Sequence, residues 1–173
     1  MFICDSTFLI AFYIELDNRL DILLKVKNKD KKVVYFITPL IFSEVSAKSP
    51  DLFQDNPSLF PVFPQKQGKE IENEYLPFLE PFVGKGEREV ILYSISYGKT
   101  PILDDKFAVK VWLKISGKKP MRTSRFIVET YCSWDIISKS EAIHLLKKLK
   151  EKGFRISDDI LLSLIRTIDT CKK

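Results

Sequence analysis

The sequence predicts an α/β fold built around a mostly parallel sheet, and two observations lead to this prediction. Short apolar segments alternate along the chain with longer segments whose apolar residues recur at helical spacing. One apolar segment is a continuous run of β-branched and aromatic residues, typical of a strand covered on both faces. A chain of 173 residues fits one hydrophobic core, so we expect a single domain over residues 1–173.

The first third of the chain predicts two strands, each followed by a helix. Residues 2–4 are an apolar strand that ends at Asp5. A long helix follows from Ser6, and the second strand lies within 31–38, where Val33–Ile37 is the continuous run. Thr38 and Pro39 then begin the next helix, because proline is favourable at the first helical position. The helical spacing after Ser6 is carried by Leu9, Phe12, Tyr13, Leu16, Leu20, Leu23 and Leu24.

The middle of the chain predicts an irregular segment, two helices and a third strand. Four prolines between residues 50 and 64 predict a proline-rich excursion at about 49–66. A short helix is expected over 69–79, and a firmer one over 87–97, where Gly98 ends it. Residues 101–103 form the third apolar strand, which ends at Asp104 and Asp105, and a helix follows over 107–115.

The last third of the chain is expected to be helical, most clearly at about 138–170. Ser138 and Glu141 have the spacing of a capping box, and Gly153 ends the helix that they begin. Asp158 opens the final helix.

The composition indicates the cellular compartment of the protein more than it indicates its function. The net charge of +5 permits a polyanionic partner, although the lysines are interpreted as spread through several helices. Three cysteines without paired spacing (Cys4, Cys132, Cys171) favour a reducing compartment and argue against a disulfide or a zinc site. The longest apolar run, residues 8–14, is too short to cross a membrane, and no signal peptide is recognised. We therefore expect a cytoplasmic protein.

Acidic residues stand where the sheet would bring them together. Asp5 and the Asp104–Asp105 pair each follow a strand, and ligands of such sheets bind beyond the carboxyl ends of the strands. Glu44 falls on the apolar side of its helix and Glu87 at the head of an apolar stripe, where an unpartnered carboxylate is costly. Glu89, in contrast, is expected to point towards solvent.

Carboxylates gathered at one edge would repel one another, and a divalent cation would relieve this repulsion. Oxygen ligands without a histidine or cysteine cluster indicate Mg²⁺ or Mn²⁺. A site of this kind suits the hydrolysis of phosphodiester bonds.

These motifs together resemble the PIN domain, including the VapC-like toxins. The resemblance rests on Asp5-Ser-Thr, on Thr-Pro-Leu-Ile-Phe-Ser-Glu44-Val, on Gly86-Glu87 and on Ile-Leu-Asp104-Asp105. The segment from Gly84 to Ile91 and the close of the chain are similar to an uncharacterised bacterial and archaeal branch of that family. Two departures are Leu103, where many members have threonine, and Met121–Arg125, which replaces a glycine-rich segment.

The resemblance implies a three-layer α/β/α fold and a metal-dependent endoribonuclease with Mg²⁺ or Mn²⁺. It places the catalytic acids at Asp5, Glu44, Glu87 and Asp105, with Asp104 as a further metal ligand. It also implies an RNA substrate and a homodimer without a membrane partner, and it allows the role of a toxin with an antitoxin protein.

Several other residues suit contacts with a substrate, and each also suits a plain structural role. Ser6 and Thr7 follow the first acid, but they also suit the start of a helix. Four basic residues suit phosphate contacts, although solvated surface charge is the favoured explanation; they are Lys85, Arg88, Arg122 and Arg125.

Two alternatives belong to other functional classes. The first is a non-catalytic PIN-like module that binds RNA or protein, against which the intact acids argue. The second is an aspartate-based phosphatase of the haloacid-dehalogenase type, which would need an acid at position 7, where the sequence has threonine.

Overall fold

The computed structural model describes residues 1–63 and 69–171, which divide into two compact units. The first unit comprises Met1–Leu9 and Val34–Met121, and the second comprises Ile10–Val33 and Arg122–Lys173. The chain therefore leaves the first unit after its first strand, returns for the second strand, and leaves again after residue 121.

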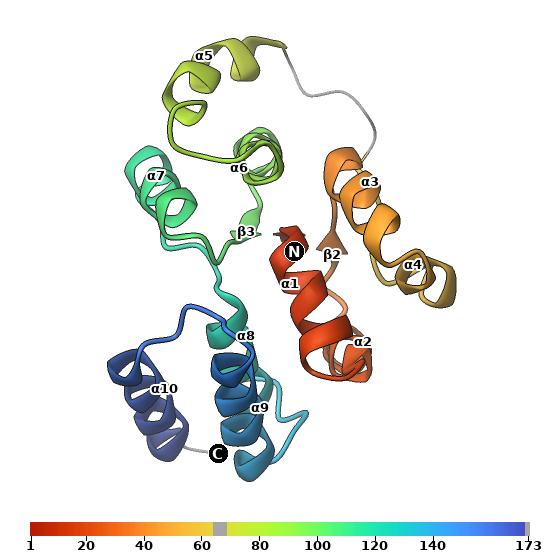
Figure 1. Cartoon of the computed structure of the whole chain (residues 1–173), viewed down its shortest axis with the longest axis vertical. Coiled ribbons are helices and arrows are strands. Elements are labelled where there is room, and N and C mark those ends of the chain that lie inside the picture. The colour runs from red at the N-terminus through yellow and green to blue at the C-terminus, as the bar shows by residue number, and fades with distance from the viewer. Residues whose placement is uncertain (64–68, 172–173) are drawn as a thin grey trace. The chain divides into compact units, whose positions relative to one another are not determined.

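The first unit contains a three-stranded parallel sheet in the order β2–β1–β3 (Figure 1). Its strands are β1 (Phe2–Cys4), β2 (Tyr35–Phe36) and β3 (Thr100–Ile102). Phe2 pairs with Tyr35 on one side and with Thr100 on the other. Because β1 is central, the strand order changes direction beside it, which places the switch point at the carboxyl end of β1. The predicted α/β class and parallel sheet are confirmed.

The second strand is shorter than the apolar run that predicted it. Only Tyr35 and Phe36 pair with β1, which is itself three residues long. The next residue, Ile37, bridges instead to Val62: its N–H donates to the Pro61 carbonyl (3.1 Å), and its own carbonyl accepts from the Phe63 N–H (3.0 Å). The proline-rich excursion therefore returns to the edge of the sheet, after a short helix α4 (Asp51–Asp55).

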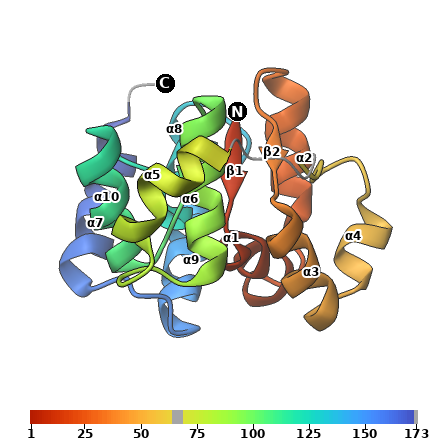
Figure 2. The same ribbon diagram turned by 90° about the horizontal axis from the view of Figure 1, so that it is seen from above.

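Four longer helices belong to the first unit: α3 (Pro39–Lys48), α5 (Lys69–Leu79), α6 (Lys85–Tyr97) and α7 (Lys106–Ser116). Helix α6 is central among them, because it contacts β1, β3, α3, α5 and α7. Both views show α5 next to α6, and the two helices are in contact (Figures 1 and 2). Thr38 caps α3 as expected, and Gly98 ends α6 with a φ of 59°, in the left-handed region that glycine adopts without strain.

The long helix predicted from Ser6 is wrong, because the segment is broken into three parts. These parts are α1 (Ser6–Ile10), the π-helical turn η1 (Ala11–Glu15) and α2 (Leu20–Lys29). Between η1 and α2, Asp17 and Asn18 have φ angles of 54° and 56°. Asp and Asn tolerate this left-handed conformation, which a continuing helix cannot contain.

The second unit packs η1 and α2 with α8 (Thr123–Cys132), α9 (Lys139–Glu151) and α10 (Asp158–Thr170). Helix α8 is its centre: it contacts α9 and α10, and its Phe126 meets Phe12 edge to face at 5.8 Å. Ser138 and Ser157 cap α9 and α10, so the expected helical end of the chain is confirmed.

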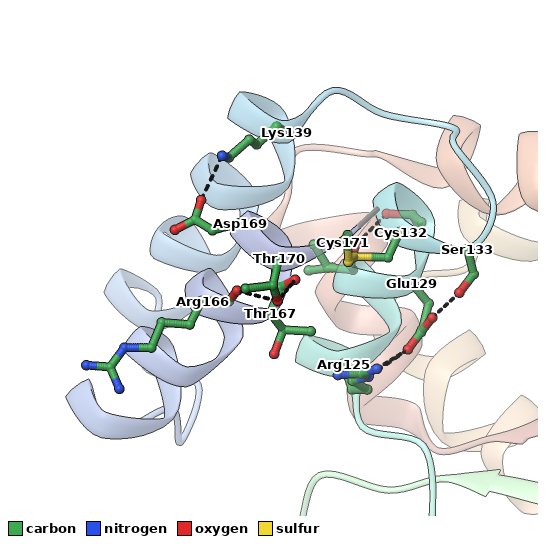
Figure 3. The surroundings of a disulfide bond; sticks show 12 residues. Arg125, Glu129, Cys132, Ser133, Lys139, Arg166, Thr167, Asp169, Thr170 and Cys171 are labelled. Atoms are coloured by element: carbon green, nitrogen blue, oxygen red, sulfur yellow. Dashed lines mark hydrogen bonds and ion pairs between the residues drawn. A yellow bond between two sulfur atoms is a disulfide. The ribbon is translucent and has the colours of Figure 1, made fainter. Parts of the chain in front are cut away.

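A disulfide joins Cys132 at the end of α8 to Cys171 just after α10 (Figure 3). The sequence argued against a disulfide because these cysteines are 39 residues apart without paired spacing. The interpretation was wrong because α8 and α10 end side by side, with the two Cα atoms 5.6 Å apart. Cysteine usage therefore no longer argues for a reducing compartment. No described helix is both long enough and apolar enough to cross a bilayer.

Candidate active site

Asp5 is the most buried acid at the switch point of the sheet. It directly follows β1, and only 2% of its surface is exposed. Its Oδ1 accepts a hydrogen bond from the Ser6 N–H at 2.7 Å. Its Oδ2 is buried and has no hydrogen-bond partner among the described residues. A buried carboxylate oxygen in this state is costly unless a proton or a cation neutralises it.

The surroundings of Asp5 oppose its ionisation. Burial, the nearby Glu87 carboxylate and, more weakly, Asp104 raise the pKa of Asp5 from 3.8 to about 7. The Thr7 hydroxyl and the Ser6 amide favour the ionised form and lower the pKa, but each by less than burial or Glu87 raises it. Two acids from α6 and from the end of β3 thus act on the acid at the end of β1.

The side chains of Glu44 and Glu87 both lie against the start of α6, beside its glycines. A Cβ atom on Gly86 would lie 3.2 Å from Glu44 Oε2, so the Glu44 carboxylate rests against the helix one residue before Glu87. A Cβ on Gly84 would lie only 2.5 Å from Glu87 Oε2, which shows that the Glu87 side chain turns back over the helix start. Both glutamates are half-buried, as their predicted positions on the helix faces required.

Asp104 and Asp105 have different surroundings although they are adjacent. Asp104 is the member of the pair that raises the pKa of Asp5. Asp105 caps α7: its Oδ1 accepts hydrogen bonds from the N–H groups of Phe107 (2.8 Å) and Ala108 (3.0 Å). One oxygen of Asp105 therefore stabilises the helix start.

A family model described as a PIN domain matches residues 1–170, nearly the whole chain. The chain belongs to the PIN-domain family. Proteins of this family are typically nucleases, so a nuclease-type fold is shown, in agreement with the resemblance of the acidic motifs. Searches of curated proteins and of solved structures found no match.

PIN-domain nucleases generally use divalent metals. In the described part of the chain, no three His, Cys, Asp or Glu side chains gather in an arrangement that could hold an ion. The buried, unpartnered Oδ2 of Asp5, beside two further acids, nevertheless fits a cation, as does the oxygen-only donor set. In this PIN domain the acids are thus neighbours without forming a closed ligand cage.

Glu89 does not point to solvent as the sequence suggested. Its Oε2 accepts a hydrogen bond from the main-chain N–H of Leu40 at 3.0 Å, so it serves the first turn of α3. Burial, and to a smaller extent the Glu89 carboxylate, raise the pKa of Tyr93 to about 12. The helical pattern of α6 gave no signal for this role, because the partner is a backbone group of another helix.

The hydroxyl and basic candidates for substrate contacts are divided between the two units. Ser6 and Thr7 begin α1, and both act on Asp5. Lys85 is exposed at the start of α6, whereas Arg88 is paired with Glu80 at 3.2 Å. In the second unit, Arg122 precedes α8 and Arg125 pairs with Glu129. Their predicted phosphate contacts remain predictions.

Cys4 and His144 are two further side chains with chemically reactive groups. Cys4 is fully buried, and burial and the neighbouring Asp5 raise the pKa of its thiol well above its ordinary value, which favours the protonated form. A protonated thiol is a poor nucleophile. His144 is exposed on α9.

Proposed function

We propose that this PIN domain is a Mg²⁺- or Mn²⁺-dependent endoribonuclease that hydrolyses RNA phosphodiester bonds beside Asp5. The observation that carries the proposal is the Asp5 carboxylate, which has one unpartnered oxygen and whose pKa is raised to about 7 by burial, by Glu87 and, more weakly, by Asp104. Such an arrangement costs stability by itself, and it becomes favourable when a cation is bound. Perturbed acids at a sheet switch point are also common features of functional sites.

In this proposal the carboxylates hold the ion, and the surrounding residues orient them. Asp5, Glu44, Glu87 and Asp104 are the ligand candidates, with the second oxygen of Asp105 as a further one. When bound, the ion supplies positive charge to the scissile phosphate and helps water to ionise. The Ser6 amide fixes one Asp5 oxygen, and Gly86 lets the Glu44 carboxylate rest against α6. The polypeptide thus contributes the placement of negative charge on β1, α3, α6 and the end of β3.

The proposal is tested by incubating the purified chain with single-stranded and looped RNA, with and without Mn²⁺. We expect Mn²⁺-dependent cleavage that falls to background in Asp5→Asn. Asp159→Asn is the matched control, because Asp159 is an exposed acid in the first turn of α10. Absence of cleavage with every RNA, or equal cleavage by Asp5→Asn, would contradict the proposal.

One observation favours the second candidate, a non-catalytic module that binds RNA or protein. This observation is that the described acids do not form a ready-made ion cage. Calorimetric titration with Mn²⁺ separates the two candidates: saturable binding that Asp5→Asn abolishes supports the nuclease, and no binding supports the module.

A toxin role and a homodimer are further parts of the proposal. Exposed aromatic side chains in the first unit, Phe78 (64%) and Phe82 (60%), would suit association between two copies. Light scattering that shows only monomer would contradict the dimer. Growth arrest on expression, relieved by the product of a neighbouring reading frame, would support a toxin with an antitoxin.

A further inference from the structure

Most of the net positive charge of the chain lies in one short segment, residues 25–32, which we name the lysine tract. It holds five lysines (Lys25, Lys27, Lys29, Lys31 and Lys32) and a single acid, Asp30. Five lysines against one aspartate leave +4 of the chain's net +5, so the rest of the chain carries only +1. Lysines do occur in several helices, as interpreted from the sequence, but the interpretation missed this tract, in which acids do not balance them.

The structure presents the tract at the C-terminal end of α2 and in the turn that follows. Lys25 and Lys29 are exposed and four residues apart, so they lie on the same side of the helix. Lys31 and Lys32 are also exposed, beyond the last helical residue. All five lysines belong to the second unit.

Two lysines of the tract make contacts with uncharged groups. Lys25 pairs with Asp21 at 2.8 Å, but Lys29 and Lys31 reach uncharged oxygens, each at 3.5 Å. These oxygens are the Asp135 carbonyl and the Asn28 side-chain oxygen. The acid within the tract, Asp30, accepts a hydrogen bond from the Lys32 main-chain N–H at 2.9 Å and so shapes the turn.

Stabilisation of α2 explains only part of this pattern. Lys27 and Lys29 lie in the last turn, where cations interact favourably with the helix dipole. That effect fades within one turn, and Lys31 and Lys32 lie after the helix end. Their repulsion from neighbouring lysines is unfavourable unless an anion binds.

We propose that the lysine tract binds the phosphate backbone of single-stranded RNA. The choice of RNA as the polyanion rests on the proposed nuclease function. An anionic membrane fits less well, because a membrane-surface helix needs a broad exposed apolar face. Four apolar residues of α2 are buried, and Leu24 is exposed at only 36%; the buried ones are Leu20, Ile22, Leu23 and Val26.

The salt dependence of RNA binding tests this proposal. The variant Lys29→Gln/Lys31→Gln/Lys32→Gln removes three charges from the tract. The matched control, Lys118→Gln/Lys119→Gln/Lys147→Gln, removes three charges from exposed positions elsewhere. Binding of a labelled oligouridylate to the full chain is followed by fluorescence anisotropy in EDTA, so that no metal-dependent cleavage occurs. Thermal melting checks that both variants remain folded.

Each phosphate contact on a single strand contributes about 0.7 to the slope of log affinity against log salt. We expect the tract variant to lose about 2 from this slope, and the control to match the unchanged protein. Between about 50 and about 200 mM salt, the unchanged protein should lose roughly 20-fold more affinity than the tract variant. Equal slopes in the tract variant and the unchanged protein, or equal losses in the two variants, would overturn the proposal.

Two further measurements separate this proposal from a membrane contact and from the proposed nuclease function. If the tract variant loses binding to vesicles of phosphatidylserine but keeps the full RNA slope, the tract is a membrane contact and the proposal is overturned. If the unchanged chain shows the tract-dependent slope but cleaves no RNA with Mn²⁺, the proposed nuclease function fails and the tract stands. If the unchanged chain cleaves RNA and the tract variant keeps the slope of the unchanged chain, only the proposed role of the lysine tract is rejected.

Discussion

The carboxylate of Glu89 on α6 accepts a hydrogen bond from the backbone amide of Leu40 on α3, at 3.0 Å. The Thr38 hydroxyl accepts from the next amide, that of Ile41, at 3.3 Å. The first turn of α3 is therefore held by one residue from its own segment and by one from another helix. Since α3 carries Glu44 and α6 carries Glu87, this bond ties together two of the helices that deliver acids to the site.

Glu89→Ala should lower the free energy of unfolding by about 1 to 2 kcal/mol, because a charged acceptor is lost from a helix start. Glu89→Gln keeps an acceptor oxygen and should cost less than half of that. Glu80→Ala is the control, since Glu80 is 67% exposed and its surface ion pair contributes at most about 1 kcal/mol. Urea denaturation measures all three. Equal losses for the Ala and Gln variants would argue against the hydrogen bond.

Gly86→Ala should reduce RNA cleavage without reducing stability. The added Cβ would lie 3.1 Å from Ile41 Cδ1 and 3.2 Å from Glu44 Oε2, so the Glu44 carboxylate must shift by a few tenths of an ångström. Alanine is favoured over glycine in a helix by up to about 1 kcal/mol, which offsets this crowding. We expect a fall in kcat of about 10-fold, since small misplacements of reacting groups are costly. Ser96→Ala, further along α6, should leave kcat unchanged.

Asp5→Asn should stabilise the metal-free protein, and the gain should increase with pH. The folded protein holds the Asp5 proton up to a pKa of about 7, whereas the unfolded chain releases it near 3.8. The destabilisation is therefore absent below pH 4, grows between pH 4 and 7, and is complete above pH 7. A shift of this size corresponds to roughly 4 kcal/mol.

Urea denaturation in EDTA checks this expectation: the two proteins should have similar stability near pH 4 and differ most at pH 8. Adding Mn²⁺ at pH 8 should stabilise only the unchanged protein. A constant difference across this range would show that Asp5 ionises normally in the fold.

Asp104→Asn and Asp105→Asn should differ in activity. Loss of the Asp104 charge should lower the pKa of Asp5 slightly, since Asp104 is the weakest of the groups that raise it. It should also reduce cleavage strongly, because Asp104 is a proposed ligand of the ion. Asparagine at position 105 still caps α7, so stability should change by less than about 0.5 kcal/mol, whereas Asp105→Ala should cost about 1 kcal/mol. The pH profile of kcat/KM and urea denaturation provide the measurements. Cleavage that depends on Asp105 and not on Asp104 would favour the original assignment of the fourth acid.

The parts of the fold that local chemistry determines could be predicted from sequence. Asp5 and Asp104 follow apolar strands, and Thr38, Ser138 and Gly98 stand at helix ends where their side chain or backbone freedom is required. Strand ends in a parallel sheet share one edge, so the pattern could predict that Asp104 lies near enough to act on Asp5.

Features that depend on two distant segments could not be predicted in this way. The helical pattern of α6 separates its own faces, but it does not reveal that Leu40 offers an amide to Glu89. Likewise, nothing in the spacing of Cys132 and Cys171 shows that α8 and α10 end together. The break after η1 was missed because the apolar period continues past Asp17 and Asn18, where only the backbone conformation changes.

The bond between Cys132 and Cys171 closes α9 and α10 into a covalent ring. A protease that cuts once within residues 133–170 would therefore release no fragment unless a reductant were also present. The end of this protein should survive single nicks as one molecule, which a gel run with and without thiol would reveal.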